Sequence, residues 1–272
     1  MSSQPSPVTF HFAHANGFPA GSYRTLFGYL PSDWQCLSIE RLGHSPRYPV
    51  NKNWQNLVQE VIDNVKRHNV GGGVYAVGHS FGAVVSYMAA CQQPELFRGL
   101  IMLDPPLVTG PYRHAVRLAK MTPLIDKMTP AGLSKSRNAR WPADTDLVAY
   151  FAKKGLFKHM DRRCIADYVN AVAERDGDDW VLGFRPEVET AIFRHVPHNL
   201  SSFSGKLRCP AVLVTGEHTN VCVPAMRNRF IKANKLEHTR LPGGHMFPLE
   251  HPKAVADFLV SQINQWEQAG NA

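Results

Sequence analysis

The sequence predicts an α/β fold in which a mainly parallel sheet of about six or more strands carries helices on both faces, in three layers. Three observations lead to this fold class. Short apolar runs alternate with helical runs in residues 1–106 and again in residues 199–272. A Gly-x-Ser-x-Gly motif stands where one of the predicted strands meets its helix. Between the two alternating stretches, residues 107–198 are typical of a helical insertion.

The first stretch contains four predicted strands, each short enough to be buried in a sheet: 7–13 (PVTFHFA), 34–40 (WQCLSIE), 73–78 (GVYAVG) and 99–104 (GLIMLD). A helix is predicted over 53–68, where apolar residues recur at helical spacing. A second helix over 81–93 is rich in alanine and ends at Pro94. Alternation of strand, helix and strand favours parallel pairing with crossover helices.

The last stretch resumes this pattern. It contains predicted strands over 210–216 (PAVLVTG) and 236–241, with a helix over 224–233 between them. A closing amphipathic helix over 252–266 places five apolar residues on one face: Val255, Phe258, Leu259, Ile263 and Trp266. We therefore predict that residues 1–106 and 199–272 fold together as one core domain.

Residues 107–198 interrupt the alternation and are longer than an ordinary connection between elements. They contain no good strand pattern, and their helical fragments are separated by Pro123, Pro130, Pro142, Gly155 and Gly177. The insertion follows the strand that comes after the Gly-x-Ser-x-Gly helix. We expect it to form a helical cap over the carboxyl edge of the sheet.

Composition excludes several classes of protein. In 272 residues, 44% are hydrophobic and 19% are charged, which argues against wholesale disorder and coiled coil. The five cysteines are odd in number and form no Cys-x-x-Cys pair, as expected of free thiols in a reducing compartment. Residues Met1 to Pro7 lack the apolar run of a signal peptide, and no run approaches the ~18 residues of a membrane span. The sequence thus predicts a soluble cytoplasmic protein.

The motif Gly78-His79-Ser80-Phe81-Gly82 directly follows the strand 73–78 and opens the helix 81–93. A sharp turn from strand to helix lifts a serine hydroxyl out of the sheet into a cleft. Glycines on either side remove Cβ atoms that would clash in such a turn. The amide of Phe81, at the start of the helix, would point toward a developing oxyanion. Ser80 is therefore the candidate nucleophile.

At this motif the chain resembles the α/β-hydrolase fold superfamily, in particular its serine hydrolase branch with a helical cap. The resemblance covers almost the whole length. Asn16-Gly17-Phe18-Pro19 follows the first strand, where the family commonly has His-Gly-x-Pro. The resemblance implies that the amide of Phe18 is the second oxyanion donor. It leaves open the role of Asn16, which replaces the usual histidine and is a possible substrate contact.

A histidine after the last strand would serve as general base, since a serine hydroxyl is a poor nucleophile until a base accepts its proton. His245 stands there, after the strand 236–241 and the glycine-rich loop Pro242-Gly243-Gly244. His79, beside the nucleophile, is a weaker candidate and a possible substrate contact. In a regular turn its side chain would point away from Ser80.

The third member of the triad has two candidates. The family order is serine, acid, histidine, and the acid commonly follows the penultimate strand. There the chain has Thr219, with Glu217 nearby. Some branches of the family instead place the acid after the strand that follows the elbow helix, and here Asp104 ends that strand. A carboxylate buried at that point needs a partner, which an imidazole N–H would provide. We favour Asp104 as the acid and keep Glu217 as the alternative.

A serine nucleophile with histidine and a carboxylate predicts acyl transfer to water, as in esterases, thioesterases and lactonases. An aspartate nucleophile, as in the haloalkane and epoxide hydrolases of this fold, is not expected. Hydrolysis of carbon–carbon bonds and perhydrolysis use the same triad and stay open. A non-catalytic scaffold that binds a ligand is the alternative from another class. The acyl group and the oligomeric state are left open.

No cofactor or metal is expected. The chain has no Walker motif, no dinucleotide fingerprint and no His-Glu-x-x-His. No nucleic-acid-binding signature accompanies the formal net charge of +8, so the expected partner is a small-molecule acyl substrate. Seven aromatic residues could line a lipophilic pocket: Phe18, Trp141, Tyr150, Phe151, Phe157, Trp180 and Phe184.

The basic excess is concentrated in residues 113–163, which hold twelve basic and four acidic residues, whereas the rest of the chain is balanced. This distribution places the whole excess on the first half of the predicted cap. It favours a cap that attracts an anionic substrate or product, or that rests on an anionic lipid surface. A well-solvated helical surface would explain it equally.

Overall fold

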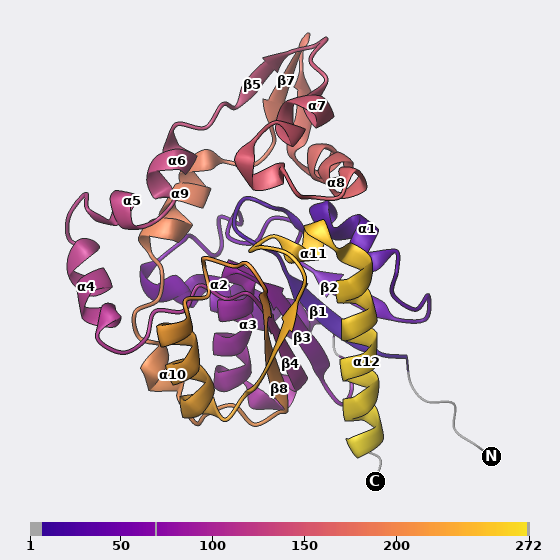
Figure 1. Cartoon of the computed structure of the whole chain (residues 1–272), viewed down its shortest axis with the longest axis vertical. Coiled ribbons are helices and arrows are strands. Elements are labelled where there is room, and N and C mark those ends of the chain that lie inside the picture. The colour runs from indigo at the N-terminus through magenta and orange to yellow at the C-terminus, as the bar shows by residue number, and fades with distance from the viewer. Residues whose placement is uncertain (1–6, 69, 271–272) are drawn as a thin grey trace.

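The computed structural model describes residues 7–68 and 70–270 (Figure 1). A six-stranded sheet forms its centre, in the order β2-β1-β3-β4-β8-β9, and every pair of neighbours is parallel. The strands are β1 (Thr9–Ala13), β2 (Gln35–Ser38), β3 (Val74–His79), β4 (Phe97–Leu103), β8 (Ala211–Gly216) and β9 (Glu237–Leu241). The predicted parallel sheet is confirmed. The prediction about Met1–Pro7 falls almost entirely outside the described residues.

Helices cover both faces of this sheet, as predicted. The elements on one face are α2 (Gln55–His68), α3 (Phe81–Gln92) and α10 (Pro224–Asn234), and those on the other are α1 (Arg24–Phe27) and α12 (Pro252–Gly270). Shorter pieces complete the core: η1 (Ala20–Tyr23), η2 (Lys52–Trp54), η3 (Pro94–Leu96), η5 (Leu200–Phe203) and α11 (Phe247–Glu250). The result is the expected three-layer arrangement.

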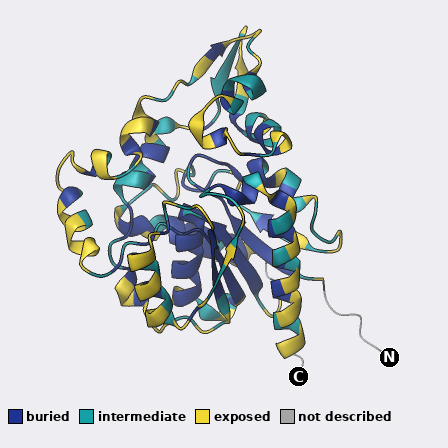
Figure 2. Cartoon of the chain, in the orientation of Figure 1, coloured by how far each residue is buried: buried dark blue, intermediate teal, exposed yellow. Residues whose placement is uncertain are grey.

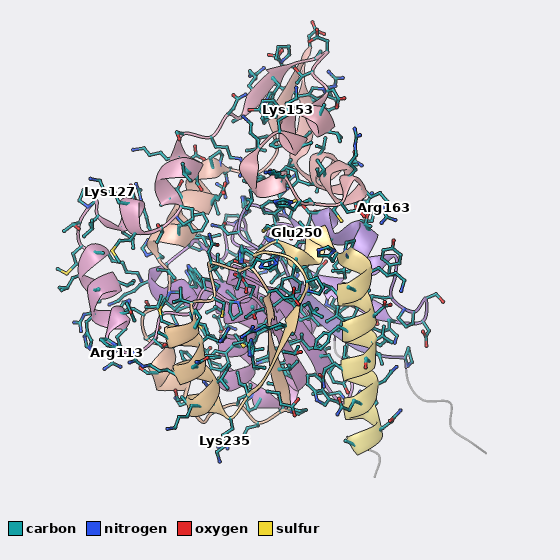
Figure 3. All side chains as sticks on the ribbon, in the orientation of Figure 1. Arg113, Lys127, Lys153, Arg163, Lys235 and Glu250 are labelled. Atoms are coloured by element: carbon teal, nitrogen blue, oxygen red, sulfur yellow. The ribbon has the colours of Figure 1, made fainter. Side chains whose placement is uncertain are left out.

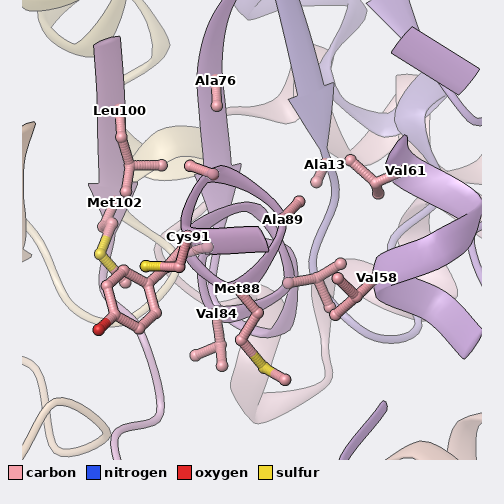
Figure 4. Close-up of a cluster of buried hydrophobic side chains, with 14 of the residues drawn as sticks. Ala13, Val58, Val61, Ala76, Val84, Met88, Ala89, Cys91, Leu100 and Met102 are labelled. Carbon is pink, nitrogen blue, oxygen red and sulfur yellow. The ribbon is translucent and has the colours of Figure 1, made fainter. Parts of the chain in front are cut away.

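The alternation of side chains along each strand divides the buried core into two clusters. Ala76, Leu100 and Met102 face α2 and α3, and Figure 4 shows them beside Val58, Val84 and Met88. Neighbouring residues such as Val77, Ile101 and Leu103 face the opposite way, toward Val255, Leu259 and Ile263 of α12. Figure 2 shows the central strands β1, β3, β4 and β8 and the helix α3 almost wholly buried. Elements at the carboxyl ends of these strands therefore have a rigid base.

The inserted residues 107–198 lie above the carboxyl ends of the strands (Figure 1). Their helices are short: α4 (Tyr112–Ala119), α5 (Ile125–Met128), α6 (Ala131–Lys135), α7 (Leu147–Ala152), η4 (Gly155–Phe157), α8 (Arg162–Val172) and α9 (Pro186–Arg194). Side chains from α7, η4 and α8 join the core cluster on the α12 face. Ile192 of α9 and Val196 join the other cluster, so the insertion packs against the core on both faces of the sheet.

The prediction that residues 107–198 contain no strand is wrong. They include a three-stranded antiparallel sheet in the order β5-β7-β6, formed by β5 (Arg140–Pro142), β7 (Asp179–Leu182) and β6 (Ala173–Asp176). Each strand has only three or four residues, and β6 is largely exposed. Such short strands show no readable hydrophobic alternation. The hairpin turns at Gly177, whose φ of +60° favours glycine.

No helix in the described part of the chain is both long and apolar enough to cross a lipid bilayer.

Candidate active site

Ser80 occupies a strained turn between β3 and α3. Its φ and ψ are 54° and −119°, outside the regions that L-residues ordinarily adopt. The two flanking glycines make the turn possible. A Cβ on Gly82 would lie 2.0 Å from the carbonyl oxygen of Ala13, and one on Gly78 would lie 2.5 Å from that of Gly82. The backbone N–H of Ser80 donates to the Leu103 carbonyl at 2.7 Å, which ties the turn to β4.

His245 lies between Ser80 and Asp104. Its Nε2 is 3.0 Å from Ser80 Oγ, and its Nδ1 is 2.5 Å from Asp104 Oδ2. A carboxylate only accepts hydrogen bonds, so the proton on Nδ1 points to Asp104 and Nε2 is left to accept from the serine hydroxyl. The side chain of Asp104 is fully buried, and that of His245 is 17% exposed. The structure thus brings together all three residues of the predicted triad.

The carboxylate of Asp104 has a second partner that the sequence did not reveal. Thr219, in the loop after β8, donates its hydroxyl to Oδ2 at 2.5 Å. Asp104 itself has a φ of +45°, and its backbone N–H donates to the Val214 carbonyl at 2.8 Å. The threonine therefore occupies the place where the family commonly has its acid. One feature of the sequence could have indicated this contact: Thr219 replaces the usual acid, and a threonine keeps a hydroxyl that can donate a hydrogen bond.

Glu217, the alternative acid, lies away from this cluster. Its backbone N–H pairs with the Leu241 carbonyl between β8 and β9, and the residue is exposed. Within the described residues, no hydrogen bond or ion pair joins its carboxylate to His245. Geometry therefore favours Asp104 over Glu217.

His79 was expected as a possible substrate contact, and the structure contradicts this. The side chain is completely buried and does not line the cavity beside Ser80. Its Nε2–H donates to the backbone carbonyl of His245 at 2.9 Å, and its Nδ1 accepts from the Tyr23 hydroxyl at 2.7 Å. Burial holds the pKa of His79 well below its usual value, with the neighbouring His245 adding to the effect. His79 is thus a neutral brace for the loop that carries His245.

The two predicted oxyanion amides differ in availability. Phe81 is the first residue of α3, where an N–H has no partner within the helix. Phe18 N–H already donates to the Ala15 carbonyl at 3.0 Å, closing a turn in which Gly17 has a φ of +78°. The resemblance to the family rests on the residue types of this loop. It therefore did not indicate that the Phe18 N–H is already hydrogen-bonded.

A cavity of about 1060 Å³ opens between the core and residues 107–198 and reaches Ser80 and His245. Its walls are mostly apolar. Five of the seven predicted aromatic residues line it, namely Phe18, Trp141, Tyr150, Phe151 and Phe157. Trp180 and Phe184 do not: Trp180 lies under the Arg175 guanidinium, and Phe184 is buried beneath Arg137. A space of this size and lining suits a lipophilic small molecule.

One polar group of this cavity is held rigidly. Arg137 forms an ion pair with Glu189 of α9 at 2.9 Å and also contacts the Tyr168 hydroxyl. Asn16, the predicted substrate contact, lines the same cavity and donates from Nδ2 to the Glu189 carbonyl at 3.0 Å. These contacts connect the loop after β1 to the inserted segment beside Ser80.

Comparison with known proteins agrees with this architecture. Residues 12–258 match the alpha/beta hydrolase family. The chain is 25% identical over 224 residues to an uncharacterized hydrolase, YugF, of Bacillus subtilis, covering 77% of this chain and 72% of that protein. It is 24% identical over 173 residues to a type I acyl-CoA thioesterase, mpaH, of Penicillium roqueforti, covering 58% and 38%.

The fold is also similar to that of a solved E-2-(acetamidomethylene)succinate hydrolase. The TM-score is 0.75 at 17% identity, over 95% of this chain and 91% of that one. The chain spans between 18% and 72% of the length of the curated relatives that it matches. The family match covers most of the sequence, and the parallel sheet and the turn at Ser80 accord with it. This chain belongs to the alpha/beta hydrolase family.

Proposed function

We propose that this protein is a serine hydrolase that cleaves carboxylic esters or thioesters of a lipophilic acyl group. The observation that carries the proposal is the continuous hydrogen-bonded chain from Ser80 Oγ through His245 to Asp104 Oδ2. Each member follows a different strand, at the carboxyl edge of the sheet. Such a chain lets a serine attack a carbonyl at neutral pH.

In the proposed reaction, His245 Nε2 accepts the proton of Ser80 as Oγ bonds to the substrate carbonyl carbon. The imidazolium then gives this proton to the leaving alcohol or thiol as its bond to the carbonyl carbon breaks, which leaves an acyl-enzyme. Water, deprotonated by the same Nε2, attacks the acyl carbon; the imidazolium then returns the proton to Ser80 Oγ as its bond to the acyl carbon breaks, which releases the acid. Asp104 holds the Nδ1–H tautomer and stabilises the imidazolium. Thr219 holds the carboxylate in place.

The negative charge on the carbonyl oxygen would be bound first by the Phe81 amide at the start of α3, whose N–H has no backbone partner among the described residues. Phe18 N–H would contribute by sharing its hydrogen between the Ala15 carbonyl and the oxyanion. Donors of this kind are worth about 3–4 kcal/mol each in other serine enzymes. We expect Phe81 to supply the larger share.

Residues 107–198 would act as the cap of this site. The cavity beneath them is lined mainly by apolar side chains, including Trp141, Tyr150 and Phe157, and it ends at the nucleophile. Such a wall favours acyl chains over polar acids. The mpaH relative is a thioesterase, which adds thioesters to the substrates worth testing.

The direct test is turnover of p-nitrophenyl esters and acyl thioesters of graded chain length by the protein and by Ser80→Ala. The variant should lose about 10⁶-fold in kcat, because removal of a triad nucleophile leaves only binding and oxyanion stabilisation. Ser202→Ala is a matched control, since this exposed serine lies in η5 on a surface outside the cavity. Equal activity in Ser80→Ala and the parent protein would refute the proposal.

A further inference from the structure

A second pocket lies beside the catalytic cavity, where α4, α5 and α9 meet η2 of the core. Its volume is about 710 Å³. Its lining comes from η2, from α4 and the turn after it, from α5, and from α9 and the loop that follows it: Lys52, Arg117, Lys120, Met121, Thr122, Pro123, Ile125, Asp126, Arg194, His195 and His198. We call this the basic pocket. The reaction proposed above uses none of these residues.

Charge in the basic pocket is unbalanced. The lining holds four basic side chains, those of Lys52, Arg117, Lys120 and Arg194, and a single carboxylate, that of Asp126. This carboxylate is already committed, because Arg194 binds both of its oxygens, at 2.7 and 2.6 Å. Among the described residues, Lys52, Arg117 and Lys120 make no ion pair at all. Three cations are therefore gathered in one concave surface without a counter-charge.

Specific contacts hold the ammonium of Lys120 in place, unlike a cation on an open surface. Its ammonium is half-buried and donates to Asn53 Oδ1 and to His198 Nδ1, both at 3.2 Å. Both acceptors are neutral, so they orient the charge without compensating it. Burial, reinforced by the nearby Lys52, lowers the pKa of Lys120 to about 8. A bound anion would relieve both penalties.

We propose that the basic pocket binds a phosphoryl-bearing anion, with Lys52, Arg117 and Lys120 as its cationic contacts. The number of unpaired cations decides the class of ligand. A carboxylate would balance one of the three, whereas a phosphate dianion or a diphosphate balances two or all of them. The pocket also has room for a diphosphate with a further group attached.

The position of the pocket places this anion close to the active site. One face of α4, with Tyr112, Ala115 and Val116, lines the catalytic cavity, while Arg117 and Lys120 face the basic pocket. Likewise Ile192 and Phe193 of α9 line the cavity, and Arg194 lines the pocket. A phosphoryl group held there would lie beside an acyl chain held next to Ser80.

Titration calorimetry with pyrophosphate at low ionic strength tests the proposal without requiring any enzymatic activity. The parent protein should bind one equivalent, and orthophosphate should bind to the same site more weakly. Arg117→Gln and Lys120→Gln should each weaken pyrophosphate binding about tenfold, the value expected for one charge-assisted contact. Acetate at the same concentration should not bind, because a monoanion leaves two cations unbalanced.

Lys127→Gln is the matched control. Lys127 lies on α5, is exposed and does not line the pocket, yet its substitution changes the net charge of the same segment equally (Figure 3). It should retain the parent affinity for pyrophosphate. Melting temperatures without ligand verify that all three variants fold. Failure of the parent protein to bind pyrophosphate would overturn the proposal, and so would equal losses in Lys127→Gln and Arg117→Gln.

Two sources of the phosphoryl group can be separated if the protein hydrolyses thioesters, a step that rests on the proposed function. An acyl-coenzyme A and the same acyl N-acetylcysteamine thioester differ in the phosphates of the leaving group. If the group belongs to the substrate, Lys120→Gln raises KM for the first thioester alone. If the pocket takes a free anion, KM for both thioesters moves equally while pyrophosphate binding is still weakened. The calorimetric result stands whether or not Ser80 is active.

Discussion

The core around Ser80 and the inserted residues 107–198 are built in opposite ways. At the edge of the core, polar groups are buried and held by several contacts, as Asp104 is by His245 and Thr219. The insertion instead exposes large apolar side chains on short helices, among them Leu118, Met121 and Leu133 at 66%, 79% and 79% exposure. The basic excess lies in its first half, residues 113–163, and Figure 3 labels Arg113, Lys127, Lys153 and Arg163 around its outer surface. A closely packed edge that carries the proposed triad is thus joined to a charged cover of short, partly exposed helices.

The largest expected effect comes from Asp104, the acid of the proposed triad. Asp104→Asn should lower kcat by about 10³–10⁴-fold, because the amide favours the wrong histidine tautomer. Glu217→Gln, which removes an exposed carboxylate outside the cluster, should retain the parent rate. Ester turnover at saturating substrate measures both. A loss confined to Glu217→Gln would show that the acid lies after β8 instead.

Stability of the core should depend on Glu60, a buried residue of α2 that accepts from the Gly43 N–H at 3.0 Å. Burial raises the pKa of Glu60 to about 7. Because the folded pKa lies above the unfolded one, this contribution is complete below about pH 4.5 and is lost as pH rises through 7. The loss would be about 3 kcal/mol, at ~1.4 kcal/mol per pKa unit.

Denaturant unfolding at pH 5 and pH 8 measures this effect. Buried His11, His14 and His79 have lowered pKa values, so their contributions are lost in the opposite direction, as pH falls below about 6.5. The difference between the parent protein and Glu60→Gln isolates the carboxyl group. The variant should show the weaker loss of stability toward pH 8. Identical pH profiles would contradict the assignment.

Thr219 tests whether the buried contacts around Asp104 matter for catalysis. Its hydroxyl acts through Asp104 and does not reach the substrate. Thr219→Val should lower kcat/KM about tenfold, the scale of one hydrogen bond to a charged group. It should also shift the acid limb of the pH–rate profile, which a purely structural role would not move. Thr219→Ser, which keeps the hydroxyl, should restore both. Equal losses in the valine and serine variants would refute this positioning role.

The last effect concerns the cover. Ala115 lies on the exposed helix α4 and lines the cavity, so Ala115→Trp should narrow it without disturbing the core. The ratio of kcat/KM for octanoyl over acetyl esters should fall about tenfold, the scale of a poorly accommodated apolar group. Competition between the two p-nitrophenyl esters measures this ratio directly. An unchanged ratio would place the acyl chain elsewhere in the cavity.

The sequence predicted the core far better than the cover. Runs such as 99–104 are buried on both faces and flanked by helices with a clear apolar stripe, so local pattern and tertiary packing agree. The strands of residues 107–198 escaped prediction because they are short and partly exposed. Their pairing depends on the Gly177 turn and on contacts such as Trp141 opposite Trp180, which no local pattern records.

The candidate site likewise combines residues that could be predicted with contacts that could not. Ser80 and His245 could be predicted because each lies in a glycine-dependent loop at a fixed place in the order of strands. The hydroxyl of Thr219 and the bracing by His79 could not, because both depend on loops that meet only in the folded chain. The internal bond of Phe18 likewise follows from a turn geometry that residue identity alone does not specify.

The most direct test of the central claim is labelling of the intact protein with a fluorophosphonate, followed by mass spectrometry of its peptides. We expect one adduct per chain, on the peptide that carries Ser80, and no adduct in Ser80→Ala. His245→Gln should slow labelling by several orders of magnitude, because the base that activates the hydroxyl is gone. Failure of the folded parent protein to label at Ser80, or an adduct that persists in Ser80→Ala, would contradict the central claim.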